Sequence, residues 1–253
     1  MSLSEPGGGN RPEIIAHRGY SARFPENTVP ALLGALAWGC GSLEWDIRFA
    51  ADGIPVLFHD ETLERTSNGS GLLSRLTSAE LSELDAGSWF SSTFRGIPIP
   101  TLQEALARIG SRAIRVYPEV KAVGGLPDLD TLLRILRSSG LHSRTTLLSL
   151  DHAILDEVRA RDPELSLGWV VGREEELGPA ADAVEADGKG LLDPDAALLL
   201  ADPSRTRDLV ARGIPIATWT VDDPAEAEAL RELGILRITT NRVSHLLQWA
   251  EAS

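Results

Sequence analysis

Short β-rich runs alternate with helix-like runs along nearly the whole chain, starting at Glu13. Strands that are separated by helical patterns are typical of βα units, in which helices cover a parallel sheet. The predicted strands are Ile14–Ala16, Leu43–Ile47, Ile54–Phe58, Ile114–Tyr117, Thr145–Leu148, Ser166–Val170, Ala197–Leu200, Ile214–Thr218 and Ile235–Thr239. Caps and apolar periodicity predict helices over residues 28–38, 101–109, 129–137, 152–161, 205–212, 224–233 and 243–251.

If Ile54–Phe58 is set aside as an extra strand, the remaining strands are as many as close a (β/α)₈ barrel. We therefore predict a single TIM-barrel domain over residues 1–253, with a doubly wound open sheet as the alternative. Residues 1–12 are expected to form a flexible lead-in, and the boundaries over residues 172–195 cannot be placed. Between residues 61 and 100 the alternation stops, which predicts a small inserted subdomain after the second barrel strand.

The charge composition limits the molecules that this protein can bind. The chain has 24 Lys and Arg against 37 Asp and Glu, a formal net charge of −13, so its surface repels nucleic acid and anionic lipid. Cys40 is the single cysteine, which excludes an internal disulfide framework and fits a reducing cytoplasm. The start of the chain lacks the features of a signal peptide, and residues 31–43 are too short to span a bilayer. We expect a cytoplasmic protein without stable membrane association, and the oligomeric state stays open.

Two histidines stand where apolar runs stop. His17 and Arg18 follow Ile14–Ala16, and His59 with Asp60 follows Ile54–Phe58. In TIM barrels the catalytic side chains gather at the C-terminal ends of the strands. A single histidine there can equally be a hydrogen-bonded structural residue, but two imidazoles beside acidic residues can act as an acid and a base.

Three carboxylates are predicted to converge on neighbouring strands. Glu44 and Asp46 are two residues apart on one strand, so both project from the same face. Glu119 and Lys121 repeat this spacing near the end of the next barrel strand. Like charges that point into a barrel need a cation, and an all-oxygen ligand set selects Mg²⁺ or Ca²⁺ over Zn²⁺. The alternative is an exposed edge strand with solvated charges.

With these histidines and carboxylates in this order, the sequence resembles the glycerophosphodiester phosphodiesterase family. The matching motifs, in order, are His17-Arg18-Gly19, Pro25-Glu26-Asn27-Thr28, Glu44-Trp45-Asp46, Asp52-Gly53, His59-Asp60, Leu63-x-Arg65-Thr66, Gly69-x-Gly71, Ala86-Gly87-Ser88-Trp89-Phe90, Pro100-Thr101-Leu102-x-Glu104, Glu119-x-Lys121, Trp219-Thr220-Val221 and Thr240-Asn241. The resemblance covers nearly the whole chain except residues 1–12 and 172–195.

The resemblance implies a TIM barrel with an inserted subdomain that hydrolyses glycerophosphodiesters to glycerol 3-phosphate and an alcohol through a cyclic phosphate. It implies one divalent metal, Mg²⁺ or Ca²⁺, with Mn²⁺ as a further candidate. The implied roles are metal ligation by Glu44, Asp46 and Glu119, acid/base catalysis by His17 and His59, phosphate binding by Arg18 and Lys121, and substrate contacts by Trp219 and Ser149. Trp219 can instead be a packing residue, and Ser149 a structural hydroxyl.

The chain departs from the family pattern at substrate-contact positions. Asp222 stands where Asn is common, Leu148 and Leu150 flank Ser149 where Gln and Phe are common, and Val243 stands where Pro often follows. These departures put the substrate contacts in doubt and leave the predicted activity untouched. Separately, two rival functions stay open. One is a phospholipase D of the same barrel type that acts on lysophospholipids or sphingomyelin, and the other is a catalytically silent barrel that binds a phosphorylated ligand.

Overall fold

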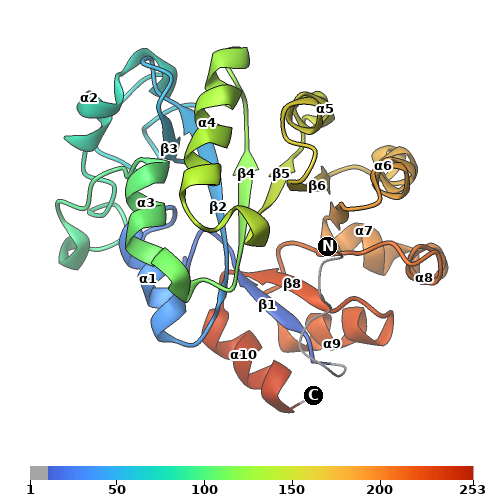
Figure 1. Cartoon of the computed structure of the whole chain (residues 1–253). Helices are drawn as coiled ribbons and strands as arrows, with labels where there is room; N and C mark the ends of the chain where they lie inside the picture. Colours follow the sequence, from blue (N-terminus) through green and yellow to red (C-terminus); the bar gives the residue numbers. More distant parts are fainter. Residues whose placement is uncertain (1–10, 253) are drawn as a thin grey trace.

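The computed structural model describes residues 11–252, which form a barrel of parallel strands surrounded by helices (Figure 1). The strands are β1 (Glu13–Ala16), β2 (Ser42–Phe49), β3 (Pro55–Leu57), β4 (Arg115–Val120), β5 (Thr146–Ser149), β6 (Ser166–Val171), β7 (Leu191–Pro194) and β8 (Arg237–Thr240). The α-helices are α1 (Val29–Ala37), α2 (Ser78–Ser82), α3 (Leu102–Ile109), α4 (Leu126–Ser138), α5 (His152–Arg161), α6 (Glu174–Asp187), α7 (Ala196–Ala201), α8 (Pro203–Ala211), α9 (Pro224–Glu232) and α10 (Val243–Ala252). Short 3₁₀ turns lie at η1 (Leu73–Arg75), η2 (Ser92–Phe94), η3 (Gly110–Arg112) and η4 (His142–Arg144).

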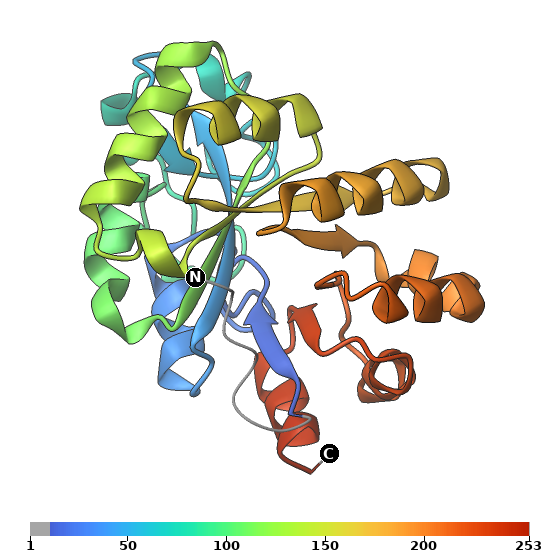
Figure 2. The same ribbon diagram turned by 45° about the vertical axis from the view of Figure 1, so that its right-hand side comes forward.

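The sheet curls until its two ends meet. Its order is β7-β6-β5-β4-β2-β1-β8, and β1 and β8, blue and red in Figure 2, pair in parallel. Segment 214–219 closes the ring through parallel bridges from Ile216 to Leu192 of β7 and from Thr218 to Ile238 of β8. This segment supplies the last barrel strand, as predicted for Ile214–Thr218, although it forms isolated bridges and no continuous ladder. The predicted TIM barrel is confirmed.

One predicted strand is wrong. Ala197–Leu200 lies in helix α7, and the barrel strand at this point is β7, which the sequence left unplaced together with α6. Alanine and leucine are strong helix formers, and the Asp195 side chain caps α7 by accepting a hydrogen bond from the Ala197 N–H. The four residues of β7 include Asp193 and Pro194, which interrupt the apolar run that marks a buried strand.

Residues 61–100 pack around a small core of their own. They follow β3, which pairs antiparallel with β2, and contain η1, α2 and η2. Figure 1 shows this region beside β3, at one side of the barrel. The buried cluster beneath it comprises Ala50, Val56, Phe58, Leu63, Leu73, Leu81, Ala86 and Ile99. The predicted subdomain boundaries remain a proposal, and the predicted lead-in, residues 1–12, falls almost entirely outside the described residues.

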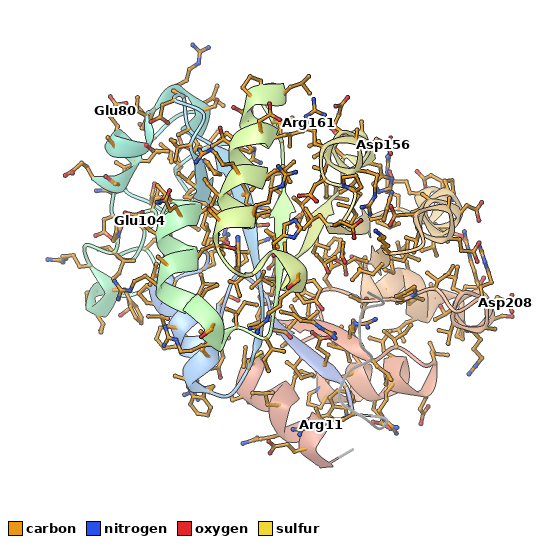
Figure 3. The ribbon with its side chains drawn as sticks, viewed as in Figure 1. Arg11, Glu80, Glu104, Asp156, Arg161 and Asp208 are labelled. Atoms are coloured by element: carbon orange, nitrogen blue, oxygen red, sulfur yellow. The ribbon has the colours of Figure 1, made fainter. Side chains whose placement is uncertain are left out.

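Local sequence signals account for the helix ends. Thr101 and Glu104 form a capping box at the start of α3, where the sequence predicts a helix over residues 101–109. Figure 3 shows the labelled charged residues Glu80, Glu104 and Asp208 on the outside of the molecule, where most of the negative charge is solvated. Cys40 is buried, and burial raises the pKa of its thiol to about 12, so this side chain is an inert part of the core. None of the described helices combines the length and the apolar character needed to cross a bilayer.

Candidate active site

A cavity of about 170 Å³ opens at the C-terminal ends of the barrel strands. It collects residues from strands that lie on all sides of the barrel. The lining residues are His17, Arg18, Glu44, His59, Glu119, Lys121, Leu148, Leu150, Val170, Asp193, Trp219, Thr220 and Thr239. Seven of the nine site residues predicted from the sequence line this one cavity; Asp46 lies directly beneath it, in contact with Arg18 and Lys121.

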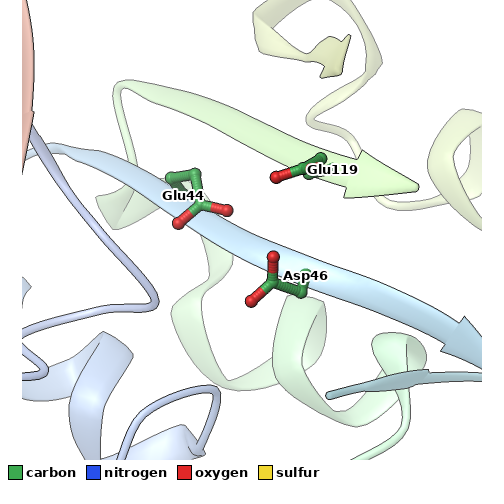
Figure 4. A group of neighbouring side chains, drawn as sticks. All are labelled: Glu44, Asp46 and Glu119. Carbon is green, nitrogen blue, oxygen red and sulfur yellow. The ribbon is translucent and has the colours of Figure 1, made fainter. Parts of the chain in front are cut away.

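The three predicted carboxylates converge because of strand register. Asp46 of β2 is the direct neighbour of Glu119 in β4, and Glu44 lies two residues before Asp46 on the same face. Figure 4 shows the three side chains turned toward one another between the two strands. One oxygen from each lies within 4.8 Å of the others, a spacing suited to a shared cation. Glu44 Oε1 is buried and has no hydrogen-bond partner among the described residues, so this oxygen is available to bind a cation.

The pKa values of the three carboxyl groups are shifted in different directions. Burial raises the pKa of Glu44 well above its ordinary value, and the charges of Asp46 and Glu119 raise it further. Burial likewise raises the pKa of Glu119. At Asp46 burial acts in the same direction, but Lys121 and Arg18 outweigh it and lower the pKa of this carboxyl. Lys121 Nζ lies 3.0 Å from Asp46 Oδ1 and 2.7 Å from Glu119 Oε1.

A second layer of side chains holds the cluster in place. Asn27 donates from Nδ2 to Asp46 Oδ2 over 2.7 Å and accepts from the Asp46 N–H through Oδ1. Arg18 places its Nε 3.0 Å from Asp46 Oδ2, donates from Nη1 to Glu26, and donates its backbone N–H to Glu44 Oε2. The motif Pro25-Glu26-Asn27-Thr28 was recognised in the sequence, but these roles depend on contacts that only the folded chain creates. Such partners commonly fix the orientation of metal ligands.

His17 is held by Asn241. Its Nδ1 lies 2.8 Å from Asn241 Oδ1, and its Nε2 lies 4.0 Å from Glu44 Oε2. Asn241 in turn donates from Nδ2 to Asp222 Oδ2 over 2.9 Å. Burial lowers the pKa of His17 to about 4, and the neighbouring Arg18 guanidinium lowers it as well. The imidazole is therefore neutral near pH 7.

His59 has a different partner. Its Nδ1 lies 2.6 Å from Asp60 Oδ1, and Asp60 is held by two hydrogen bonds from Arg65. The Arg65 hydrogen bonds lower the pKa of Asp60, so this carboxyl is ionised. Burial lowers the pKa of His59, whereas the hydrogen bond to Asp60 acts in the opposite direction. The two histidines thus present Nε2 to one cavity, one backed by an amide and the other by a carboxylate.

Trp219 and Ser149 differ in their placement. Trp219 lines the cavity, and its Nε1 donates to the Asp193 carbonyl oxygen over 3.0 Å. Ser149 is fully buried; its Oγ donates to the Val120 carbonyl and accepts from the Asp151 N–H. Ser149 is not among the lining residues, which supports the structural hydroxyl that the sequence left as the alternative.

The model of the glycerophosphoryl diester phosphodiesterase family matches residues 17–245 of this chain. The chain belongs to this family. It is 31% identical over 232 residues to a glycerophosphodiester phosphodiesterase of Caldanaerobacter subterraneus subsp. tengcongensis, a match that covers 90% of this chain and 93% of the relative. A glycerophosphodiester phosphodiesterase of Bacillus subtilis is 28% identical, with 90% and 82% covered.

Solved structures of the family share this fold. An Oleispira antarctica phosphodiesterase in complex with the product sn-glycerol-3-phosphate superposes with a TM-score of 0.88 at 29% identity, over 96% of this chain and 98% of that one. The predicted family is confirmed, and so is the prediction that the chain is an enzyme, a glycerophosphodiester phosphodiesterase.

Among the lining residues that the sequence analysis did not predict, Asp193 is the one with an ionisable side chain. Asp193 of β7 is 4% exposed, and its Oδ1 has no hydrogen-bond partner among the described residues. Burial raises the pKa of Asp193 to about 8, and the charge of Glu119 raises it further. Asp193 and Asp195 have the spacing of Glu44 and Asp46, but the sequence did not identify β7 as a strand, and Asp195 caps α7.

Proposed function

We propose that the enzyme hydrolyses glycerophosphodiesters to glycerol 3-phosphate and an alcohol with a divalent metal and with His17 and His59 as the acid/base pair. One observation carries the proposal: three carboxylates, two buried and one half-buried, meet beside one cavity that both imidazoles also line. The family to which the chain belongs supports the substrate class, since its model and the relatives are named glycerophosphodiester phosphodiesterases.

Glu44, Asp46 and Glu119 would hold the metal. All three offer carboxylate oxygens, which suits Mg²⁺ or Ca²⁺, with Mn²⁺ as a further candidate. The fit is also electrostatic, because Arg18 and Lys121 leave one negative charge of the three carboxylates uncompensated. A divalent ion turns this into one net positive charge, which complements a phosphodiester monoanion. When bound, the ion supplies charge that offsets the negative charge developing on the phosphate oxygens.

The partners of the two histidines favour different roles. Burial and the Arg18 guanidinium keep the His17 ring neutral, and the amide oxygen behind Nδ1 holds the ring proton there, so the lone pair is on Nε2, which suits a general base. The ionised Asp60 behind His59 stabilises an imidazolium, and a bound phosphate anion favours it further, which suits a general acid. We assign His17 as the base and His59 as the acid in the first step.

In that step the glycerol 2-hydroxyl gives its proton to His17 Nε2 and attacks phosphorus in line. The bond from phosphorus to the alcohol oxygen breaks, and that oxygen takes a proton from His59 Nε2. Water then attacks the cyclic phosphate, giving its proton to His59, while the 2-oxygen leaves and recovers its proton from His17. Arg18 and Lys121 bind the phosphate oxygens, and the tethered hydroxyl makes a protein nucleophile unnecessary.

Trp219 would form an apolar wall for the carbon atoms of the substrate. Its indole lines the cavity, and the hydrogen bond from Nε1 to β7 fixes the ring in place. Leu148 and Leu150 extend the apolar side of the cavity. This wall offers no charge to the substrate, so it selects by shape.

One panel of assays tests the proposal against its rivals. Purified protein is incubated with glycerophosphocholine, glycerophosphoethanolamine, glycerophosphoglycerol and lysophosphatidylcholine, with Mg²⁺, Ca²⁺ and Mn²⁺ in turn. We expect glycerol 3-phosphate from the three glycerophosphodiesters. Hydrolysis of lysophosphatidylcholine alone would favour the phospholipase D type, and no hydrolysis with any metal would favour a silent ligand-binding barrel.

A further inference from the structure

Asp193 faces the carboxylate cluster from the far side of the cavity. Its strand, β7, is four positions from β2 in either direction around the closed barrel, if segment 214–219 is included. Asp193 lines the same cavity as Glu44 and Glu119. A molecule that contacts the cluster at β2 and β4 and fills the cavity therefore reaches Asp193 with its other end.

The Asp193 carboxyl has a buried oxygen without a partner. Its Oδ1 has no hydrogen-bond partner among the described residues, although the residue is only 4% exposed. Its neighbours in the cavity include the apolar side chains of Val170 and Trp219. A buried polar group without a partner destabilises a protein by more than a typical hydrogen bond contributes, so such groups are rare outside functional sites. The carboxyl therefore points to a hydrogen-bond donor in the ligand.

The chemistry of that donor can be narrowed. A phosphate oxygen of the diester is only an acceptor, and the cations Arg18 and Lys121 already face it from the other side. A quaternary ammonium group offers no hydrogen-bond donor, and cages for such groups use several aromatic rings, whereas Trp219 is the one indole or phenyl ring that lines this cavity. A hydroxyl group satisfies the carboxyl in either protonation state.

The position of the two histidines indicates which hydroxyl this is. The His59 side chain is 34% exposed and lies on the open side of the cavity, where a leaving alcohol of any size can extend into solvent. His17 is 17% exposed and lies on the inner side, with the glycerol 2-hydroxyl in the proposed reaction. The cavity of about 170 Å³ suits a small polyol phosphate in its interior. The glycerol moiety thus points inward, toward β7.

We propose that Asp193 is a specificity-determining residue whose carboxyl group binds the terminal hydroxyl of the substrate glycerol. The inference rests on the proposed function, because it assumes that the 2-hydroxyl stands at His17. It assigns Asp193 to ground-state and transition-state binding of glycerol, with no part in proton transfer. A site built to bind a hydroxyl discriminates strongly against analogues that lack it.

The test compares two substrates with the same leaving alcohol. One is the glycerophosphodiester, and the other is the 2-hydroxypropyl phosphodiester, which keeps the attacking hydroxyl but lacks the terminal one. For the wild-type enzyme we expect kcat/KM to be about 10- to 100-fold lower for the analogue. Asp193→Leu should lower kcat/KM on the glycerol substrate by a similar factor, leave the analogue nearly unaffected, and so abolish the discrimination. Asp193→Asn should restore part of it.

One control variant and the pattern of rates separate the possible outcomes. Asp162→Asn removes a buried carboxyl whose partners, His142 and Arg137, lie outside the cavity, so it should keep the wild-type discrimination ratio. Equal rates of the wild-type enzyme on both substrates would overturn the inference while the proposed function stands. The inference is also overturned if Asp193→Leu discriminates between the two substrates as strongly as the wild-type enzyme does. It is overturned as well if the effect of Asp193→Leu on kcat/KM changes with the leaving alcohol. If Asp193→Leu does not fold, the ratio of kcat/KM on the two substrates is measured for Asp193→Asn. A ratio below that of the wild-type enzyme supports the inference, and an unchanged ratio overturns it. Absence of any diester hydrolysis by the wild-type enzyme would instead refute the proposed function.

Discussion

Asn241 Oδ1 lies 2.8 Å from His17 Nδ1, and Asp222 determines which end of the amide faces the ring. The Asp222 carboxylate only accepts hydrogen bonds, so Asn241 must turn its NH₂ group to it and its oxygen to His17. Ser21 Oγ donates to the same amide oxygen. His17 Nδ1 must therefore carry the proton, which leaves Nε2 as the free base.

These hydrogen bonds from Asp222 through Asn241 to His17, here called the relay, predict one tautomer of His17. Nitrogen-15 NMR at pH 7 should show Nδ1 protonated and Nε2 unprotonated in the wild-type enzyme, since burial lowers the pKa of His17 to about 4. In Asn241→Ala both tautomers should appear, and kcat should fall on the order of 10-fold, within the range that general acid–base catalysis contributes. A mixture of tautomers in the wild-type enzyme would contradict the relay.

Metal dependence follows from the carboxylate cluster. Exhaustive chelation should abolish turnover, and Mg²⁺ or Ca²⁺ should restore it. Glu44→Gln should weaken metal binding, measured by calorimetry, by at least the roughly 10- to 100-fold that follows loss of an outer-shell partner. Glu83→Gln, at an exposed glutamate far from the cluster in sequence, should behave as wild type. Full activity after chelation would refute the site.

Lys121 should have the opposite effect on the metal. Its ammonium contacts Asp46 and Glu119, so it lowers the negative charge available to the ion. Lys121→Met should therefore bind metal as tightly as wild type or more tightly, whereas kcat/KM should fall about 10²-fold because a phosphate contact is lost. Lys121→Arg keeps the charge and should recover part of the activity. Weaker metal binding in Lys121→Met would contradict this division of roles.

The barrel and most of the cluster were predictable because they depend on local rules. Alternating faces along β2 place Glu44 and Asp46 together, and parallel pairing brings Glu119 beside them. Asp193 was not predictable, because its role arises only when the barrel closes and places β7 opposite β2. The orientation of the Asn241 amide likewise depends on Asp222, a contact between two loops that no spacing in the sequence encodes.

Leaving groups should distinguish the two histidines. His17→Ala and His59→Ala should each lower kcat by roughly 10² to 10⁴ on an ordinary alcohol diester, and the double variant should be little worse because the pair acts as a unit. With a p-nitrophenyl ester the leaving oxygen needs no proton, so His59→Ala should regain most of its activity and His17→Ala should not. Recovery of His17→Ala instead would reverse the assignment of acid and base.

The tethered nucleophile has its own substrate test. If the glycerol 2-hydroxyl attacks phosphorus, the 3-hydroxypropyl phosphodiester, which lacks that hydroxyl, cannot form the cyclic phosphate. Arg18 and Lys121 still meet its phosphate, so it should inhibit competitively with a constant near the KM of the parent. Turnover should be lost, because an intramolecular attack contributes roughly 7 to 11 kcal/mol that a free water molecule does not supply.

A rate on this analogue near that of the parent would mean that water or a protein group is the nucleophile. His17 would then act on that group, and the phospholipase D type would have to be considered again. The 2-hydroxypropyl diester is the matched comparison, because each of the two analogues lacks a different hydroxyl of glycerol. Loss of binding should follow the terminal hydroxyl at Asp193, and loss of chemistry should follow the 2-hydroxyl at His17.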